Sequence, residues 1–374
     1  MAEVLLVANY RPDQQHSMLR LAEILESGLR ANAIDVEVIR PEPFFGRWAR
    51  KWLMLNKWLR YLDKFVLFPP RLRKHARNSL LIHIVDHSNA LYCLWLKQEK
   101  AVVTCNDLLA VRSARGEFRE HQTGAAGKLL QILVLKGLQR AAHLICISES
   151  TRADVLRLTR RPESRVSRIY LGLAPIFQSA VRKSPPAPVS AEAETAAQLD
   201  LRAGRYLLHV GGNTWYKNRS GVLMIYQAIR NRLGNESPDL FMVGPALATE
   251  IEGVRFIPFI PDADLAELYR KAELLLFPSL YEGFGWPIVE AQACGCPTVI
   301  TDIPPLTEAG GKAAARITNP SDIEAAAHQV IRVLKEDAKV RAERIAAGRR
   351  QAGTFSDEQM IASYLELYAS TLRR

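Results

Sequence analysis

The sequence has little of what marks a secreted or a membrane-spanning protein. Only five of its 374 residues are cysteine, and they show neither zinc-ligand nor disulfide spacing. They are Cys93, Cys105, Cys146, Cys294 and Cys296. No apolar run reaches the length of about eighteen residues that a membrane-spanning helix needs. The first residues lack the basic region and cleavage site of a secretory signal, so we expect a reduced, cytoplasmic protein.

The glycine-rich fingerprint of dinucleotide-binding domains is also missing. Residues 4–8 have the pattern of a strand, 17–30 the periodicity of a helix, and 36–39 the pattern of a second strand. Such a strand–helix–strand opening predicts a parallel sheet covered by helices. No G-x-G-x-x-G sequence follows the first strand, so the usual sign of a dinucleotide site is absent.

Acidic residues are scarce in one segment. Between Arg47 and Arg77 there are ten lysines and arginines and a single acid, Asp63, whereas the whole chain has a net charge of +11. Apolar residues at helical spacing predict a basic aromatic helix over 47–66, which Pro69-Pro70 should end. The apolar stripe consists of Trp48, Trp52, Leu55, Leu59, Leu62 and Val66. Two interpretations stay open: the helix lies on an anionic membrane surface, or it docks on its own domain with a solvated basic face.

Polar side chains follow two of the predicted strands in the first half. Asp86-His87 come directly after strand 80–85, and Asn106-Asp107 come after strand 102–105. Ligands of open α/β sheets bind outside the carboxyl ends of the strands. We therefore expect these residues to contact a ligand.

The chain is predicted to be α/β with two tandem, Rossmann-like, doubly wound domains. Residues 176–200 have the composition of a linker, a proline cluster followed by an Ala/Glu run. They separate an N-terminal domain, 1–175, from a second series of strands and helices over 201–355. A last helix in 356–374 is expected to pack back on the N-terminal domain.

The most informative stretch places two carboxylates, Glu282 and Glu290, on either side of a glycine-rich turn. It follows the apolar strand 274–277 and precedes a helical run, 288–293. Pro287, just before this run, suits the first position of the helix. Carboxylates are acceptor-only groups suited to hydroxyls, and a sugar nucleotide is rich in hydroxyls. The alternative is a surface loop with two solvated glutamates.

A second motif could hold a diphosphate. Gly211-Gly212-Asn213 follows the strand at 206–210, with Lys217 and Arg219 just beyond. Backbone donors and a cationic side chain are what a diphosphate requires. By contrast, Asp262-Ala263-Asp264 matches an Asp-x-Asp metal pattern but directly precedes an amphipathic run, so we interpret it as a helix N-cap and first turn.

These motifs resemble the donor domain of GT-B glycosyltransferases, in particular the retaining enzymes of family 4. The similarity spans roughly 206–320, and the N-terminal half matches more loosely. The matching residues are His209-Val210-Gly211-Gly212, Lys217-Asn218, Phe277-Pro278-Ser279, Tyr281-Glu282-Gly283-Phe284-Gly285, Pro287, Glu290-Ala291, Gly295-Cys296-Pro297-Thr298-Val299 and Glu308-Ala309-Gly310-Gly311.

The resemblance implies a role for each matching residue. Lys217 is expected to contact the donor diphosphate and Glu290 the ribose hydroxyls. Glu282 is expected near the donor sugar, whose hydroxyls bind the N–H groups of Phe284 and Gly285. It also implies two domains facing across a cleft, a UDP-, GDP- or ADP-sugar donor, retention of configuration and no cofactor. With Lys217 and helix N-termini available to neutralise the diphosphate, no metal is expected.

The sequence departs from the family at two positions. Gly212 and Asn213 occupy the turn in which many relatives have an arginine, so Arg219 is the candidate for the second phosphate cation. Asn106 stands where relatives often have a histidine, and an amide cannot act as a base. Asp86 and His87 are the alternatives for that role, and Asp107 and His16 complete the candidate acceptor side.

The predicted function is transfer of a sugar from a nucleotide-sugar to a hydroxyl acceptor, such as a lipid-linked or cell-surface polysaccharide precursor. The enzyme is expected to lie peripherally at the inner face of the membrane. One alternative is a nucleotide-sugar epimerase of the same architecture. Another, from a different class, is a protein that binds an anionic surface or nucleic acid through Arg47 to Arg77, although the helical aromatic stripe favours lipid over nucleic acid.

Overall fold

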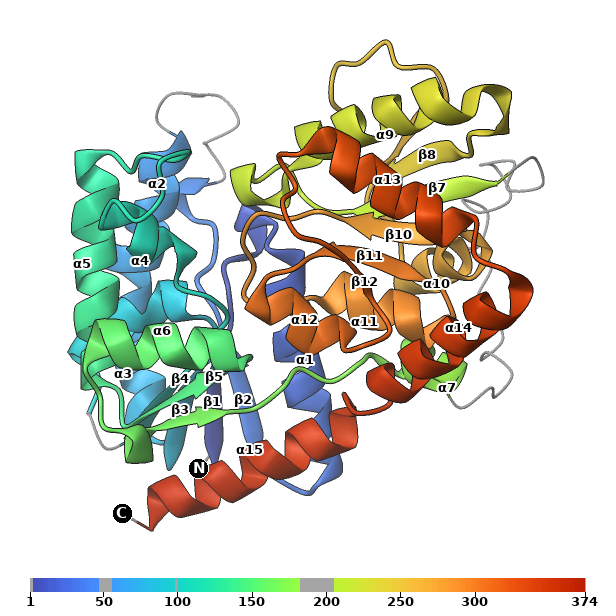
Figure 1. The fold of residues 1–374 in the computed structure, drawn as a ribbon. Coiled ribbons are helices and arrows are strands. Elements are labelled where there is room, and N and C mark those ends of the chain that lie inside the picture. Colours follow the sequence, from blue (N-terminus) through green and yellow to red (C-terminus); the bar gives the residue numbers. More distant parts are fainter. Residues whose placement is uncertain (1–2, 47–55, 98–99, 182–204, 374) are drawn as a thin grey trace. The chain divides into compact units, whose positions relative to one another are not determined.

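The structure, a computed structural model, describes residues 3–46, 56–97, 100–181 and 205–373. It forms two compact units, which we call unit 1 (Met1–Tyr170 with Asp357–Arg374) and unit 2 (Leu171–Ser356). Each unit is built on one parallel sheet, so the prediction of two tandem doubly wound α/β domains is confirmed (Figure 1). Within the described ranges, no helix is long and apolar enough to cross a bilayer.

Unit 1 contains a parallel sheet in the order β2-β1-β3-β4-β5-β6. Its strands are β1 (Val4–Val7), β2 (Val36–Ile39), β3 (Leu81–Ile84), β4 (Ala101–Cys105), β5 (His143–Cys146) and β6 (Val166–Arg168). The helices are α1 (His16–Ala31), α2 (Asn56–Leu62), α3 (Phe68–Arg77), α4 (Leu109–Ala114), α5 (Ala125–Arg140), α6 (Glu149–Thr159) and α15 (Asp357–Leu372). The central strands are buried along their whole length, as their nearly continuous apolar sequences require of a sheet covered on both faces.

The last helix, α15, belongs to unit 1 and packs against α1 (Figure 1). The two helices approach closely at Gly28, where a Cβ atom would lie 2.5 Å from the side chain of Ile361. Two tyrosines of α15 contact polar side chains of the sheet. Tyr368 Oη lies 2.6 Å from Nδ1 of His83 on β3, and Tyr364 Oη lies 3.1 Å from Oγ1 of Thr104 on β4. Burial lowers the pKa of His83 to about 3, so its ring is neutral in this contact.

The basic aromatic segment differs from its prediction. Residues 47–55, which include Trp48, Trp52 and Leu55, lie outside the described residues. From Asn56 onward the chain is helical through α2, a π-helical turn at Asp63–Leu67 and α3, so Pro69-Pro70 do not end the segment. Both prolines lie in the first turn of α3, and the early positions of a helix tolerate a missing N–H.

Unit 2 contains a second parallel sheet in the order β12-β11-β10-β7-β8-β9. Its strands are β7 (Tyr206–Val210), β8 (Asp239–Val243), β9 (Val254–Ile257), β10 (Leu274–Phe277), β11 (Thr298–Thr301) and β12 (Ala315–Ile317). Its helices are α7 (Pro175–Val181), α9 (Arg219–Leu233), α10 (Asp262–Lys271), α11 (Trp286–Ala293), α12 (Pro304–Gly310), α13 (Ile323–Leu334) and α14 (Ala338–Ala352). An apolar core of β7, β8, β10 and β11 with α9 and α13 holds the sheet in place.

The start of the predicted linker is instead part of unit 2. Residues 175–181 form α7, and Phe177 is fully buried against Tyr269. The preceding residues are held by two hydrogen bonds: Trp286 Nε1 donates to the carbonyl of Gly172, and the N–H of Leu173 donates to that of Phe355. The rest of the predicted linker, up to residue 200, lies outside the described residues.

Candidate functional site

The strand order places a topological switch point in each sheet. In unit 2 the chain runs from β7 to β8 and β9 on one side, and then returns to place β10 on the other side of β7. In unit 1 the corresponding point lies between β1 and β3. Ligands of doubly wound sheets bind at the carboxyl ends of the two strands that flank this point. We therefore expect a ligand to contact the residues that follow β7 and β10 in unit 2, and those that follow β1 and β3 in unit 1.

In unit 2 the loops after β7 and β10 are joined directly. The N–H of Leu280 donates to the carbonyl of Tyr216 at 2.7 Å, and Asn218 Nδ2 donates to the carbonyl of Pro278 at 3.0 Å. Asn218 has a left-handed backbone with φ of 52°, a region that asparagine tolerates better than most residues. A Cβ atom at Gly221 would lie 2.3 Å from the side chain of Asn218, so glycine leaves room for this bridge.

The side chain predicted to bind the diphosphate, Lys217, and the side chain predicted to bind the sugar, Glu282, form an ion pair with each other. Lys217 Nζ lies 2.7 Å from Oε1 of Glu282, and both side chains are mostly buried. The ammonium group also lies 5.1 Å from the ring centroid of Phe277, at the end of β10. A charge-assisted hydrogen bond of this length is among the stronger polar contacts in a protein. The two residues are therefore brought to one place, as the motif predicted.

Arg219 is a buried cation with no hydrogen-bond partner among the described residues. Arg219 is the first residue of α9 and is 3% exposed. All three nitrogens of its guanidinium group lack a hydrogen-bond partner in the described part of the chain. The ring centroid of Phe256 lies 5.9 Å from the guanidinium carbon. Burial lowers the pKa of Arg219 below its ordinary value. A desolvated cation without a carboxylate or carbonyl partner is unfavourable, which points to an anionic ligand.

Glycines bring the backbone close to these cations. A Cβ atom at Gly244, after β8, would lie 2.3 Å from the carbonyl of Gly211 and 3.2 Å from Nη1 of Arg219. Gly244 has φ of 132°, a conformation that favours glycine. Gly211 itself packs against Lys217 and His209, whereas a Cβ atom at Gly212 would meet nothing within 4 Å. The predicted glycine turn thus lies between Lys217 and Arg219 with an open side.

His209, on β7, adds an uncharged acceptor beneath this turn. Its Nδ1 lies 3.0 Å from the carbonyl of Leu276, so Nδ1 is the protonated nitrogen. Burial lowers the pKa of His209 to about 3, and the ring is neutral. Nε2 therefore presents a lone pair, has no partner within the described part of the chain, and would be 3.3 Å from a Cβ at Gly211.

Glu290 lies inside the first helical turns after the glycine-rich loop. It is 3% exposed, and Tyr269 Oη of α10 donates to its Oε2 at 3.2 Å. Helix α11 begins one residue earlier than predicted, so Pro287 is its second residue and Gly285 is its N-cap. A Cβ atom at Gly285 would clash with Ile288, whereas Phe284 is buried against Phe355. The loop therefore presents its backbone next to the start of α11.

Polar side chains also meet at the switch point of unit 1. Asp86, after β3, accepts a hydrogen bond from Asn9 Nδ2, after β1, at 2.6 Å. Asn106 Nδ2 lies 3.5 Å from Asp86 Oδ1, and Asn89 donates to Asn9. His87 lies between two carboxylates, with Nδ1 3.2 Å from Asp86 Oδ1 and Nε2 3.8 Å from Asp107 Oδ1. The predicted acceptor residues Asp86, His87, Asn106 and Asp107 therefore form one cluster.

Asp86 and His87 stabilise each other's charged forms. Burial alone would raise the pKa of Asp86, but the ionic contact with His87, with hydrogen bonds from Ser88 and Asn9, outweighs it and holds this pKa well below the usual range. Burial opposes the charged form of His87, yet Asp86 and then Asp107 raise its pKa above the ordinary value. His87 is consequently a stronger base than a free histidine, fixed between two negative groups.

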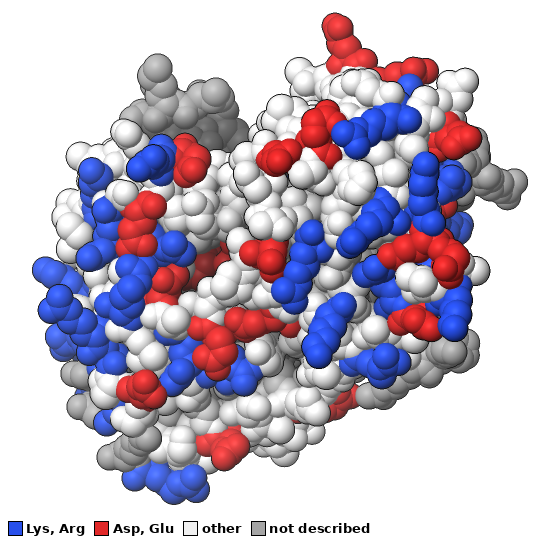
Figure 2. Space-filling model, in the orientation of Figure 1, with Lys and Arg blue, Asp and Glu red and all other residues white. Residues whose placement is uncertain are grey.

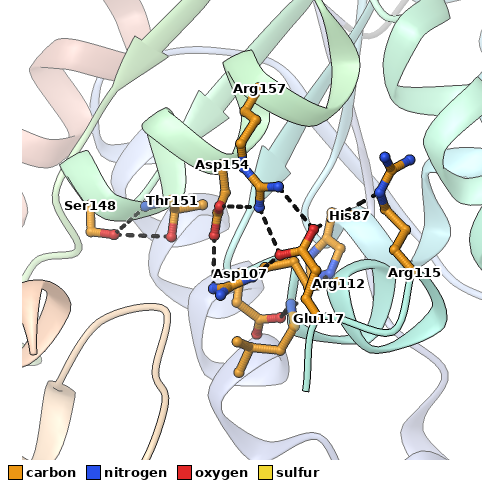
Figure 3. A network of polar contacts seen from close by, with 10 residues as sticks. His87, Asp107, Arg112, Arg115, Glu117, Ser148, Thr151, Asp154 and Arg157 are labelled. Carbon is orange, nitrogen blue, oxygen red and sulfur yellow. Dashed lines mark hydrogen bonds and ion pairs between the residues drawn. The ribbon is translucent and has the colours of Figure 1, made fainter. Parts of the chain in front are cut away.

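A network of ion pairs supports the cluster from one side (Figure 3). Arg157 of α6 binds Glu117 through two nitrogens, at 2.8 and 2.9 Å, and Asp154 at 2.8 Å. Arg112 of α4 lies 3.0 Å from Glu117 and 3.1 Å from Asp154. Arg115 also lies 3.9 Å from Glu117, so three arginines surround two acids, and the network ties α4 to α6. Oδ1 of Asp107 accepts a hydrogen bond from the N–H of Leu109, the first residue of α4.

The structure also shows where His16 and the Asp262-Ala263-Asp264 motif lie. His16 is the first residue of α1 and not a loop residue, and its side chain lies outside the described part. Pro261 is the N-cap of α10, so Asp262 and Asp264 lie in its first turn, where acids favour the helix dipole. Sequence reasoning missed Asn9 and Tyr269. The position of Asn9 directly after β1 could have revealed it, whereas nothing local marks Tyr269.

Comparisons with known proteins agree with this geometry. Residues 200–351 match the family model described as Glycosyl transferases group 1, and residues 20–175 match Glycosyltransferase Family 4. O-antigen chain mannosyltransferase B of Escherichia coli is 25% identical over 320 residues, covering 82% of this chain and 79% of that protein.

Two solved structures share the fold. Anabaena HepE in complex with UDP and glucose has a TM-score of 0.69 at 16% identity, covering 99% of this chain and all of that one. Trehalose-6-phosphate synthase of E. coli with UDP-2-fluoro glucose has a TM-score of 0.72 at 11% identity, covering 98% of each chain. With family matches over both halves and this fold, the chain is a GT-B glycosyltransferase of group 1, an enzyme that transfers a sugar.

Proposed function

We propose that the enzyme takes a sugar from a nucleotide-sugar bound by unit 2 and transfers it, with retention, to a hydroxyl of an acceptor bound by unit 1. The observation that carries the donor assignment is the guanidinium of Arg219, which is buried beside the Gly211 turn and has no hydrogen-bond partner in the part of the chain that the structure describes. Together with Lys217 it supplies two cations where a diphosphate needs them. Because these cations neutralise the leaving diphosphate, we propose that transfer needs no metal.

The other donor contacts follow from the positions of the loop and of α11. Glu290, buried and acceptor-only, binds the ribose hydroxyls. Glu282 and the N–H groups of Phe284 and Gly285 bind the hydroxyls of the donor sugar. In unit 1, the deprotonated form of His87 takes the proton of the acceptor hydroxyl while Asp86 holds its ring, and Asn106 and Asp107 position the acceptor. Because the two carboxylates raise the pKa of His87, this step is favoured at pH values above that pKa.

The names of the relatives suggest a sugar and an acceptor class. O-antigen chain mannosyltransferase B adds mannose to a polysaccharide, whereas the two structural neighbours have UDP or a UDP-sugar in their descriptions. We therefore propose that this enzyme builds a lipid-linked or cell-surface polysaccharide precursor, with a mannosyl donor as the first one to test.

The test is a thermal-shift screen of UDP-, GDP- and ADP-sugars with the unmodified chain and with Lys217→Ala. We expect one nucleotide-sugar to raise the Tm, because a ligand that binds only the folded state stabilises it. Lys217→Ala should remove most of that rise, whereas Lys339→Ala, which removes an exposed lysine of α14, should not. Equal rises in Lys217→Ala and in the unmodified chain would contradict the donor site. Incubation of the same donor without acceptor should leave it unchanged, whereas conversion to another sugar indicates an epimerase.

We also propose that unit 1 contacts an anionic membrane surface through the segment that contains α2. Trp58, Leu62 and Val66 recur every four residues and are 57%, 40% and 57% exposed. Arg60 and Lys64 instead turn inward, to the carbonyl of Pro12 and to Asp13. The single acid of the segment, Asp63, is buried and accepts a hydrogen bond from Tyr10 at 2.8 Å. The segment is thus anchored by its polar residues and presents an apolar face, as an interfacial helix does.

Basic side chains elsewhere on unit 1 add to this proposal. In the face of the molecule shown in Figure 2, lysine and arginine side chains gather along the outer edge of unit 1, at the left, whereas both signs alternate over α13 and α14 of unit 2. Cations near an anionic surface each add to its attraction, by about 1 kcal/mol per residue at close range. Apolar insertion and basic charge therefore act together in unit 1.

Vesicle pelleting checks this surface. Trp58→Ser with Val66→Ser should weaken binding to vesicles that contain phosphatidylglycerol roughly tenfold, because two exposed apolar side chains no longer enter the interface. Met224→Ser with Val340→Ser, two exposed apolar residues of unit 2, is the matched control. Pelleting that is equal in both variants would count against the surface, and salt-dependent binding of nucleic acid without vesicle binding would favour the alternative partner.

A further inference from the structure

Unit 1 contains a cavity at the opposite edge of the sheet from Asp86 and His87. The cavity has a volume of about 260 Å³ and lies where β3 and β4 begin. Its apolar wall includes Ile82 of β3 and Trp95. Because β3 is a strand of four residues, the two edges of the sheet are roughly 13 Å apart. The cavity is therefore distinct from the polar cluster at the switch point.

Four cations line this cavity: Arg73 and Arg77 from α3, and Lys97 and Lys100 from the segment before β4. No acidic side chain lines it among the described residues. Arg73, Arg77 and Lys97 are exposed and Lys100 is half-buried, so together they give the rim of the cavity a strongly positive, hydrated surface.

The fold accounts for only part of this charge. Arg73 Nε donates to the carbonyl of Trp95 at 3.3 Å, and Lys100 Nζ donates to the carbonyl of Ser79 at 2.8 Å. Arg77 lies in the last turn of α3, where cations suit the helix dipole, but its guanidinium has no hydrogen bond or ion pair with another described residue. The same holds for Lys97, which belongs to no helix in this structure. Two cationic heads therefore remain available to a ligand.

We propose that this cavity binds a phosphate monoester, with the phosphate on Arg77 and Lys97 and the organic group against Trp95 and Ile82. A phosphate offers several strong acceptor oxygens, which match the fork of an arginine and the point charge of a lysine. The flat face of Trp95 and the aliphatic floor match an apolar substituent. The same chemistry occurs in a small phosphate ester and in the headgroup of a phosphomonoester lipid.

Calorimetric titration of the full chain with phenyl phosphate tests the site. We expect Arg77→Ala with Lys97→Ala to weaken binding roughly tenfold or more, because two charge-assisted contacts are lost. Lys74→Ala with Lys136→Ala removes the same charge from α3 and α5 outside the cavity and should leave the affinity within about twofold. Inorganic phosphate should bind more weakly than phenyl phosphate, since it lacks the contact with Trp95.

A second arm separates the two sources of the phosphate. Vesicles of phosphatidylcholine, with and without phosphatidic acid, are pelleted with the same two double variants. If only the small ester depends on Arg77 and Lys97, the ligand is a soluble phosphate ester; if the vesicles depend on them too, it is a lipid headgroup. Phenyl phosphate and vesicle binding that are absent, or that fall equally in both variants, overturn the site. Equal Tm values of the two variants without ligand show that folding is intact.

Discussion

Arg219→Met should make the donor-free enzyme more stable and should weaken donor binding about 100-fold. The guanidinium is 3% exposed and has no hydrogen-bond partner within the described residues. Methionine fills a similar volume without a charge, so its unfolding free energy should rise by about 1–3 kcal/mol in the absence of ligand. Denaturant unfolding measures the first effect, and calorimetry with the donor found by thermal shift measures the second.

The opposite signs of the two effects make this variant informative. If Arg219 had a purely structural role, its substitution would lower the stability of the protein and would leave the donor affinity of the folded protein nearly unchanged. Arg219→Lys keeps the charge and should recover part of the affinity, although an ammonium cannot reproduce a bidentate contact with a phosphate. A fall in stability for Arg219→Met with normal donor affinity would show that Arg219 serves the fold and not the donor.

Glu290→Ala should weaken donor binding about 10- to 100-fold, because hydrogen bonds from hydroxyls to a buried carboxylate are lost. The same change also leaves the hydroxyl of Tyr269 without its partner, which lies 3.2 Å away in the native protein. A loss of stability is therefore expected as well, of about 1–3 kcal/mol for an unsatisfied buried group.

A second variant separates the two consequences of Glu290→Ala. Tyr269→Phe with Glu290→Ala removes both polar partners and should regain much of the lost stability while donor binding stays weak. Tyr269→Phe alone keeps the carboxylate and should bind the donor nearly as well as the unmodified chain. If the double variant recovers donor affinity together with stability, Glu290 acts through packing and not on the ribose.

Residues in motifs could be predicted from the sequence, because local spacing and strand ends determine where they lie. Glu282 and Lys217 are 65 positions apart, yet both follow adjacent parallel strands, and the structure brings them within 2.7 Å. The polar residues after β3 and β4 were predicted for the same reason, since the carboxyl ends of parallel strands share one edge.

What the sequence could not show depends on packing between distant segments. Arg219 is buried beside Gly244 and Phe256 and has no hydrogen-bond partner among the described residues, and the local sequence pattern does not encode this environment. From Leu59 to Val66 the predicted stripe is helical, whereas Trp48, Trp52 and Leu55 lie outside the described residues. The sequence left open which side of the segment is exposed, because this depends on the contacts of Lys64 with Asp13 and of Asp63 with Tyr10. The prolines at 69 and 70 were misread because a helix can restart there after a π-helical turn.

The bond between Lys217 and Glu282 has a consequence for the order of events. In this structure Lys217 and Glu282 neutralise each other, so an oxygen of Glu282 is already engaged by the lysine. At the donor site proposed above, a diphosphate that binds Lys217 would break this bond and leave Glu282 to the hydroxyls of the sugar attached to the diphosphate. Binding of the diphosphate would thus make Glu282 available to the sugar. We expect free monosaccharides to compete poorly with the donor unless the nucleoside diphosphate is present.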